Sequence, residues 1–171
     1  MRLHTWFKIF VICFIGFSLY SCRCPSEQNF VYVSDLKIIH SGNVHKGVGI
    51  DKPYWTDKLI MCGVNYKKGL IIHPENGGRT AFVEFLLPEI GGRLSGLAGC
   101  AEETGNDHNR RMRFRIFIDG ELICGQELKG NDCQNLNLDL GQGKVLRIES
   151  DDGNDGNYFD HMAFGDLRII Y

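Results

Sequence analysis

The segment that most constrains the fold is Arg111–Ile118, where arginines and apolar residues alternate. Successive side chains of a β-strand point to opposite faces, so a period of two puts the arginines together on one face. The other face carries only apolar side chains, namely Met112, Phe114, Ile116 and Ile118. This pattern predicts a half-buried antiparallel strand with one face in a core.

A turn signal follows directly. Asp119-Gly120 separates this strand from a second apolar run at residues 121–124. Asp-Gly is favoured in two-residue hairpin turns, whose central residues both need positive φ. Residues 136–140 alternate in the same way, and a further short strand is expected at 145–148. We therefore expect antiparallel strands joined by short turns.

The rest of the chain has the same character. Five more strands are expected, at residues 30–39, 69–72, 80–87, 94–101 and 162–171. The 21 glycines among 171 residues indicate many tight turns and few long helices. Strands at a spacing of roughly ten residues favour a β-sandwich over a parallel α/β sheet. The expected fold is all-β and antiparallel, as one domain over residues 30–171 with residues 23–29 as a lead-in.

Residues 1–22 have the order of a secretory signal, with basic residues first, then an apolar run, then small residues. The apolar run is too short to span a bilayer. Ser21 before Cys22, with Leu19 upstream, resembles the lipobox of bacterial lipoproteins, in which the cysteine is lipidated. We expect an exported protein that is either secreted after cleavage or anchored through Cys22 on the outer side of a membrane.

Cysteine pairing is left open by the sequence. Beyond Cys22 the chain has five cysteines, which allow two disulfides with one thiol left over. Cys124 and Cys133 are the nearest such pair in sequence, on segments that could be adjacent. The others are Cys24, Cys62 and Cys100. Zinc is not expected, because no CxxC or HxxxH spacing occurs.

Charge and motifs exclude two classes of function. Lys+Arg 19 against Asp+Glu 21 gives a net charge of -2, so no overall electrostatic attraction to nucleic acid is expected. The chain also lacks the G-x-S-x-G, H-E-x-x-H and phosphate-binding glycine motifs. Carboxylates are plentiful, but glycoside hydrolysis requires a correctly spaced pair. We therefore expect a protein that is not an enzyme.

Three segments carry a family resemblance. Residues 66–74 (YKKGLIIHP) resemble a Y-x-K-G-[IL]-x-x-H segment, residues 117–122 match a v-x-x-D-G-x-x-[LI] hairpin, and residues 152–161 are similar to a G-D-G-x-x-x-D-H loop. In this order and spacing they resemble the NPCBM family, which is related to carbohydrate-binding module family 51. The resemblance extends over residues 31–171.

The resemblance implies a jelly-roll-like β-sandwich that binds galactose-type or other glycans through loops at one edge, without catalysis. Two positions depart from the family pattern. Phe164 stands where a tryptophan is usual, and no clear W-G turn occurs between His40 and Asp51. These departures leave open a protein-interaction domain with a degenerate sugar site, and a glycoside hydrolase is a further alternative.

A sugar site needs an aromatic ring against the C–H face of a pyranose and planar polar groups for its hydroxyls. Aromatic candidates in loop-like stretches are Tyr54, Trp55, Tyr158 and Phe159. With the resemblance, the site that we expect consists of His73, Arg111, Arg113, Asn157, Tyr158, Phe159, Asp160 and His161.

Structural roles compete with these assignments. His73 could be satisfied by a backbone carbonyl at a strand end. The arginines could form a solvated face paired with acidic side chains on neighbouring strands. Asp160 and His161 would point to opposite faces of a strand, so one of them could be structural.

The loop that contains Asp151, Asp152 and Asp155 is rich in oxygen ligands and glycine, as hard-cation sites are. It does not match the EF-hand pattern. Asp and Asn also dominate ordinary turns. We weigh a structural calcium ion against a solvated turn at this loop and expect no other cofactor.

Overall fold

The computed structural model describes residues 28–75, 77–88, 91–102, 111–154 and 160–171. One sheet contains β1 (Phe30–Tyr32), β3 (Gly49–Ile50), β6 (Gly69–Ile72), β8 (Gly92–Cys100), β11 (Gln134–Gly141) and β13 (Met162–Ile170). A second sheet contains β2 (Ile38–Gly42), β7 (Ala81–Leu86), β9 (Arg111–Ile118), β10 (Glu121–Lys129) and β12 (Val145–Asp151). The 3₁₀ turn η1 (Val33–Asp35) links β1 to β2, and a hairpin is formed by β4 (Leu59–Met61) and β5 (Val64–Tyr66).

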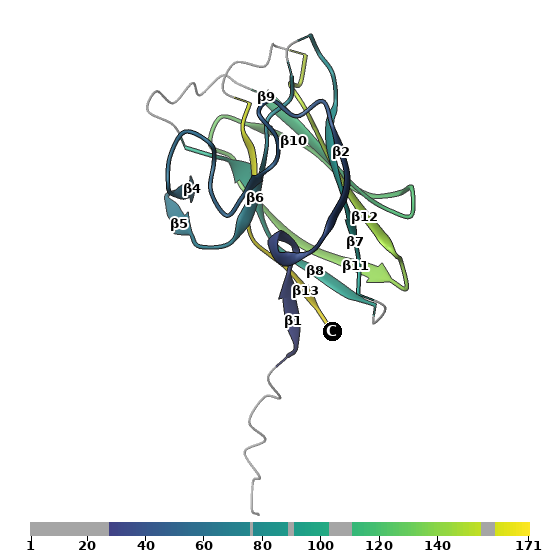
Figure 1. The fold of residues 1–171 in the computed structure, drawn as a ribbon. Helices are drawn as coiled ribbons and strands as arrows, with labels where there is room; N and C mark the ends of the chain where they lie inside the picture. Colours follow the sequence, from purple (N-terminus) through teal and green to yellow (C-terminus); the bar gives the residue numbers. More distant parts are fainter. Residues whose placement is uncertain (1–27, 76, 89–90, 103–110, 155–159) are drawn as a thin grey trace, which may run out of the picture.

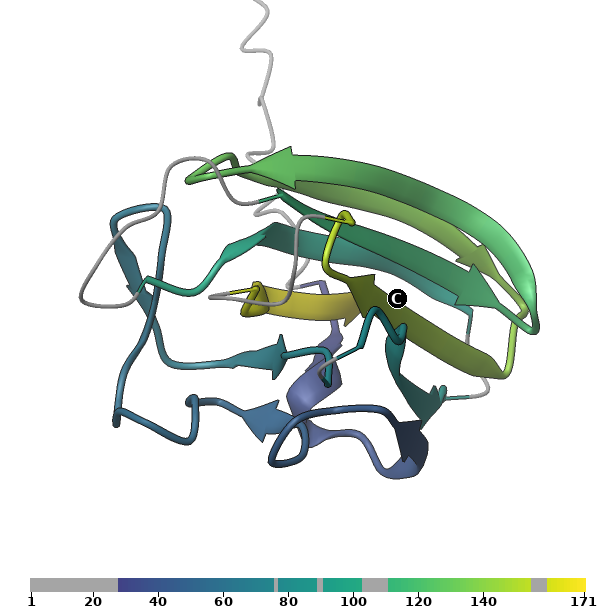
Figure 2. The ribbon, with the colours of Figure 1, turned by 90° about the horizontal axis from the view of Figure 1, so that it is seen from above.

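These strands form an antiparallel β-sandwich, which confirms the expected fold class (Figures 1 and 2). We call the sheet with order β11-β8-β13-β6-β3 sheet A; β1 also pairs with its strand β13. Sheet B has the order β10-β9-β12-β7-β2. The pairings between the described strands of both sheets are antiparallel.

The expected alternation in β9 is confirmed. Its four apolar side chains are buried and its arginines lie on the outer face of sheet B. The turn to β10 has φ of 49° at Asp119 and 87° at Gly120, as a two-residue turn between twisted strands requires. Asp119 also accepts a hydrogen bond from the backbone N–H of Val145, at 2.9 Å, which joins the turn to β12.

The prediction of a single strand at residues 30–39 is wrong, because η1 divides this segment into β1 and β2. Here the chain leaves sheet A, where β1 pairs with β13, and enters sheet B, where β2 pairs with β7. Val33 and Ser34 are buried in this crossing, and the backbone N–H of Leu36 donates to the carbonyl of Val33 at 3.1 Å. Three short strands, β3, β4 and β5, were not predicted, since they lack a run long enough to show a period.

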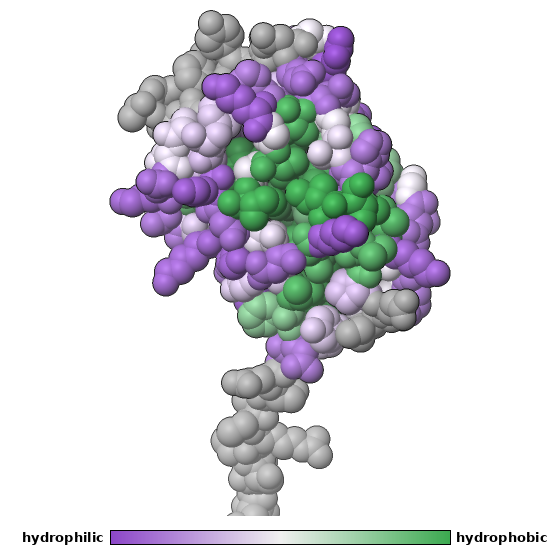
Figure 3. Space-filling view, in the orientation of Figure 1, coloured by the Kyte–Doolittle hydropathy of each residue, from purple (hydrophilic) through white to green (hydrophobic). Residues whose placement is uncertain are grey.

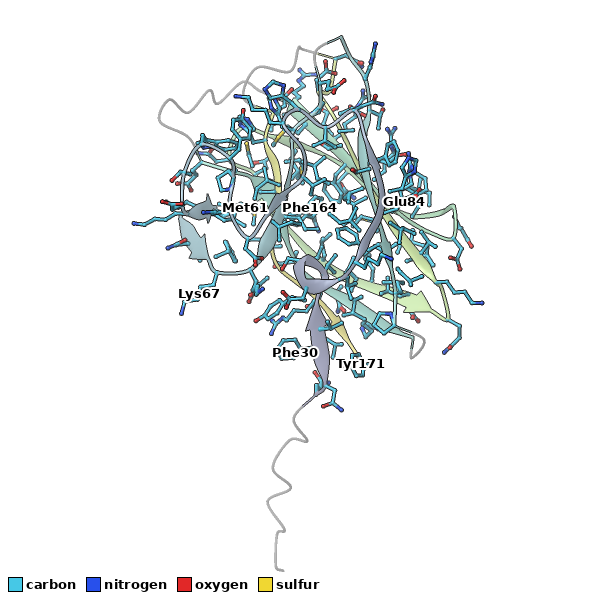
Figure 4. The ribbon with its side chains drawn as sticks, viewed as in Figure 1. Phe30, Met61, Lys67, Glu84, Phe164 and Tyr171 are labelled. Carbon is cyan, nitrogen blue, oxygen red and sulfur yellow. A yellow bond between two sulfur atoms is a disulfide. The ribbon has the colours of Figure 1, made fainter. Side chains whose placement is uncertain are left out.

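The main core lies between the sheets. It is lined by the inward side chains of both, and the rings of Phe114 and Phe164 meet edge to face with centroids 5.7 Å apart. Figure 4 shows Phe164 at the centre of the sandwich. The phenylalanine that departs from the family pattern thus occupies a fully buried aromatic position.

The core reaches the surface along the edge next to β2 and β3. Figure 3 shows hydrophobic side chains gathered on this face, bordered by polar ones. Val44 and Val48 are half-buried there against the main core, while Ile39 and Ile50 are exposed.

A second, smaller core lies on the outer face of sheet A, beneath the β4-β5 hairpin. It consists of Leu59, Met61, Ile71, Ala101 and Ala163. Figure 4 shows Met61 on this side of the sheet. The hairpin can approach closely because the sheet presents small residues. A Cβ on Gly69 would lie 2.5 Å from Leu59 Cδ2, which leaves no room for a side chain.

A disulfide joins the tip of this hairpin to the segment before β11. Cys62 pairs with Cys133 across 71 residues of sequence. The nearest candidate in sequence, Cys124, is therefore not the partner of Cys133. Cys124 lies half-buried on β10, and burial raises the pKa of its thiol.

Residues 1–22, including Cys22, lie outside the described residues, as does Cys24. The secretory signal and lipidation remain predictions. Within the described ranges, no helix is long and apolar enough to cross a membrane.

Candidate functional site

Two histidines meet at one end of sheet A because β6 and β13 are paired. His73 directly follows β6 and His161 directly precedes β13, and the register places Ile72 opposite Met162. The next positions outward are therefore opposite each other, and the centroids of the two imidazole rings lie 4.1 Å apart. His161 is buried and His73 is half-buried. This end of β13 is at the top of Figure 1, away from the C-terminus.

The loop between β2 and β3 adds a third histidine. The backbone N–H of His45 donates to the carbonyl of His73 at 2.8 Å, and Val44 forms an isolated bridge with Pro74. The N–H of Glu75 donates to the carbonyl of Asn43 at 2.9 Å. These backbone bonds hold the loop against the end of β6 and place the His45 ring 5.2 Å from the His73 ring.

The loop between β3 and β4 brings two adjacent aromatic side chains to the histidines. The Trp55 ring lies 4.0 Å from that of His161, and the Tyr54 ring lies 4.7 Å from that of Trp55 and 5.9 Å from that of His45. Tyr54 is 48% exposed, whereas Trp55 is half-buried. We call His45, Tyr54, Trp55, His73 and His161 the aromatic-histidine cluster.

Polar groups accompany the cluster. The ammonium of Lys46 lies 4.5 Å from the centroid of the Tyr54 ring. The indole Nε1 of Trp55 is buried and has no hydrogen-bond partner among the described residues. Each imidazole has two ring nitrogens, one a donor and the other an acceptor in the neutral form. The cluster therefore combines an exposed aromatic ring with several hydrogen-bonding groups.

Asp160, expected in the site, is fully buried beside His161. Its carbonyl accepts from the backbone N–H of Met162 at 3.1 Å, and the carbonyl of His161 accepts from the N–H of Ala101 at 2.9 Å. The backbone of His161 is thus bonded across to Ala101, and that of Asp160 to the first residue of β13.

The arginines expected in the site belong to the outer face of sheet B. Arg113 Nε donates to Asp151 Oδ1 at 2.7 Å, and Arg113 Nη2 donates to Asn154 Oδ1 at 3.2 Å. Arg115 pairs with Glu149 at 3.0 Å and with Asp151 at 3.1 Å. This confirms the interpretation of a face paired with acids on a neighbouring strand.

Arg111 is exposed, and its backbone lies against Gly153. A Cβ added to Gly153 would lie 2.9 Å from the carbonyl oxygen of Arg111. Arg111 and Arg113 therefore flank the start of the loop whose other end is Asp160-His161. Asn157, Tyr158 and Phe159 fall within that loop and lie outside the described residues.

The calcium ligands expected in this loop are described only in part. The two carboxylate oxygens of Asp151 accept from Arg113 and Arg115, and Asp152 accepts from the backbone N–H of Asn154 at 3.0 Å. Among the described residues, no group of three or more His, Cys, Asp or Glu side chains could hold a metal ion. Asp155 lies outside them, so the calcium site remains a prediction.

A surface pocket of about 270 Å³ adjoins the cluster and is lined by the loop between β3 and β4, from Lys52 to Asp57. Tyr54 and Trp55 form part of its wall. An ion pair between Lys52 and Asp57, with N and O 3.0 Å apart, ties the two ends of this loop together.

Sequence reasoning placed His73 and His161 in the site but not His45, Lys46 or the Tyr54-Trp55 pair. The sequence marks the aromatic pair as a possible sugar platform, and its position in a polar loop is the signal that could rank it higher. His45 gave no comparable signal, because only the backbone bonds to residues 73 and 75 bring it to the site.

Comparison with known proteins identifies the family. The model of the NPCBM/NEW2 domain matches residues 29–170. Among solved structures, a CBM51 from Clostridium perfringens GH95 in complex with methyl-galactose aligns with a TM-score of 0.71 and 18% identity, over 82% of this chain and 99% of that one.

The CBM51-2 and INT domains from Clostridium perfringens ZmpB give a TM-score of 0.71 at 17% identity, over 83% of this chain. This chain spans 31% of that one. Tandem CBM51 modules of Sp3GH98 from Streptococcus pneumoniae SP3-BS71 give a TM-score of 0.66 at 18% identity, over 82% of this chain and 46% of that one. At these identities the likeness concerns the fold. Among curated proteins, none matches this chain. The family match covers nearly all of its length, and the chain therefore belongs to the NPCBM/NEW2 domain family.

Proposed function

We propose that this protein is a non-catalytic module that binds a galactose-type or other glycan at the aromatic-histidine cluster. The observation that carries the proposal is the exposed Tyr54 ring, which lies 5.9 Å from the ring of His45 and 6.4 Å from that of His161, at one end of a carbohydrate-binding-module sandwich. The His73 ring lies next to both of these histidines. Sugar binding at similar folds supports it, since one CBM51 neighbour was solved with methyl-galactose.

The geometry suits the two surfaces of a pyranose. The Tyr54 ring has the Lys46 ammonium over one face, and its other face is proposed as the apolar plate for the C–H face of the sugar. The imidazoles of His45 and His73 can donate to one hydroxyl and accept from another. The backbone of both histidines is held by hydrogen bonds, so little backbone freedom is lost when a sugar binds.

The loop before Asp160 completes the proposed site. Asn157 precedes Asp160 by three residues in the sequence. Asn157 is proposed to hydrogen-bond the sugar, and the buried Asp160 and His161 are proposed to form the inner wall of the site. Tyr158 or Phe159 is proposed to add a second aromatic contact. Arg111 and Arg113 are proposed to act at the base of this loop.

Affinity is expected to be weak, because a single open site buries little area and sugar hydroxyls are costly to desolvate. Anchoring through Cys22 would display many copies on one membrane, where weak sites act together. We therefore propose an exported module whose partners are glycans.

The test is a glycan array with residues 23–171, with and without calcium, followed by titration of the best ligand against Tyr54→Ala and His73→Ala. The described strands all lie within residues 30–170, so this form retains the fold. Tyr171→Ala is the matched control, because Tyr171 is also exposed and lies at the other end of β13 (Figure 4).

Both site variants should lose at least about tenfold in affinity, and Tyr171→Ala should bind as the wild type does. Normal binding by Tyr54→Ala and His73→Ala would move the site elsewhere. Silence of the folded wild-type protein across the array would count against glycan binding itself. A requirement for calcium would assign an ion to the loop that starts at Asp151.

A further inference from the structure

The loop that carries Tyr54 and Trp55 begins at a residue held by several bonds. Asp51 has a φ of 61°, and its backbone N–H donates to the carbonyl of Gly69 at 2.9 Å. The N–H of Gly69 donates back to Asp51 Oδ1 at 3.1 Å, and Lys68 Nζ donates to Asp51 Oδ2 at 2.9 Å. Lys68 also pairs with Asp35 in η1. We call Asp35, Asp51 and Lys68 the lysine clamp.

The charges of the clamp stabilise one another. Hydrogen bonds to Asp35 and Asp51 raise the pKa of Lys68. Burial alone would raise the pKa of Asp51, but the hydrogen bonds from Lys68 and Gly69 outweigh it, and the pKa is lowered. Asp51 and Lys68 therefore both carry charge at neutral pH. Because a non-glycine residue at positive φ is strained, these bonds also keep Asp51 in its turn conformation.

The other end of the loop is held differently. It leads into β4, which packs into the second core and is followed directly by the disulfide-bonded Cys62. The N–H of Gly63 donates to Glu102 Oε1, and the N–H of Glu102 donates to the carbonyl of Ile60 at 2.7 Å. The aromatic pair thus lies between two anchors: a hairpin fixed by packing and a disulfide, and a clamp fixed by charge.

We propose that Lys68 is a positioning residue for the sugar site: through Asp51 it holds the β3–β4 loop so that Tyr54 and Trp55 stay against the histidines. The inference rests on the proposed function for its binding readout, although the loop geometry can be tested without a sugar. The clamp is at the surface, with 31% of the Lys68 side chain and 29% of that of Asp51 exposed. Its removal therefore leaves the main core intact.

The experiment compares Lys68→Met with Lys67→Met in residues 23–171. Lys67 is the neighbouring lysine, is exposed, and lies at the outer edge of the molecule in Figure 4. Lys68→Arg tests rescue, because a guanidinium can restore both ion pairs. The chain has two tryptophans, and the other, Trp6, is absent from residues 23–171. Tryptophan fluorescence of this form, excited beyond the absorption of tyrosine, therefore reports on Trp55 alone.

Acrylamide quenching of Trp55 should rise about twofold in Lys68→Met, as the loop opens locally while the fold persists. Affinity for methyl-galactose, or for the best array ligand, should fall about tenfold. The thermal midpoint should stay close to that of Lys67→Met, and Lys68→Arg should restore both quenching and affinity.

Quenching of Lys68→Met equal to that of Lys67→Met would overturn the proposal, whether or not the protein binds sugar. Should Lys68→Met fail to fold, Asp51→Asn replaces it, because asparagine tolerates positive φ and keeps one acceptor oxygen but loses the charge. Increased quenching in a protein that binds no sugar would support the clamp and reject the proposed function, so the two failures are distinguishable.

Discussion

Three residues of one short segment, Tyr66, Lys68 and Gly69, each contact a different part of the molecule. The Tyr66 ring covers Gly165 of β13, Lys68 pairs with Asp35 and Asp51, and Gly69 lies under Leu59 without room for a Cβ. The segment that resembled a family motif is therefore a junction between sheet A, the hairpin and the loop of the candidate site. Its residue types follow from contacts that a substitution would break.

Gly165 provides the sharpest test of this junction. A Cβ there would lie 2.6 Å from the Tyr66 ring, so Gly165→Ala should destabilise the protein by about 1–3 kcal/mol through overpacking. Gly125→Ala is the control, because its Cβ would meet Arg115 Cγ at an ordinary 3.6 Å. Urea unfolding measures both, and equal stability of the two variants would show that the ring moves aside without cost.

The β4-β5 hairpin is too small to be stable by itself. Its two strands have three residues each. It depends on the second core and on the disulfide to Cys133, which directly precedes β11 of sheet A. This explains why the sequence did not predict it: the strands owe their existence to a surface of small residues that only the folded sheet presents.

Removing the tether should therefore be costly. The double variant Cys62→Ser/Cys133→Ser should lose about 4 kcal/mol of stability, as the loop-closure entropy of a sequence separation of 71 predicts. Cys124→Ser is the control, since Cys124 is outside this disulfide. The comparison is made by urea unfolding under oxidising conditions. Unchanged stability of the double variant would mean that the second core alone holds the hairpin.

For the molecule as a whole, the sequence predicted the sandwich much better than the site. The alternation in β9 and the Asp119-Gly120 turn are local sequence patterns, and the structure has the burial and the φ angles that they predict. The aromatic-histidine cluster joins the ends of β6 and β13 to two separate loops. His45 is brought next to His73 by a backbone hydrogen bond between segments that are far apart in the sequence. Neither the amino-acid composition nor the hydrophobic periodicity predicts such a pairing.

Export and anchoring concern the full chain. In a bacterial host that processes lipoproteins, the full-length protein should partition into the membrane fraction and incorporate labelled fatty acid, because the lipobox-like sequence ends at Cys22. Cys22→Ala should abolish both, while Cys24→Ala should leave them unchanged. Soluble, unlabelled wild-type protein would instead indicate ordinary secretion.

The pairing of β1 with β13 has a mechanical consequence. Phe30 lies opposite Ile170, while His161 precedes the other end of the same nine-residue strand, about 27 Å away. A tether at the start of β1 and a sugar held near His161 would pull in opposite directions along these strands. The ladder bonds between β1 and β13 run across that line and would share the load in shear rather than open one by one. Force applied between such a tether and a bound sugar would therefore load these paired strands along their length.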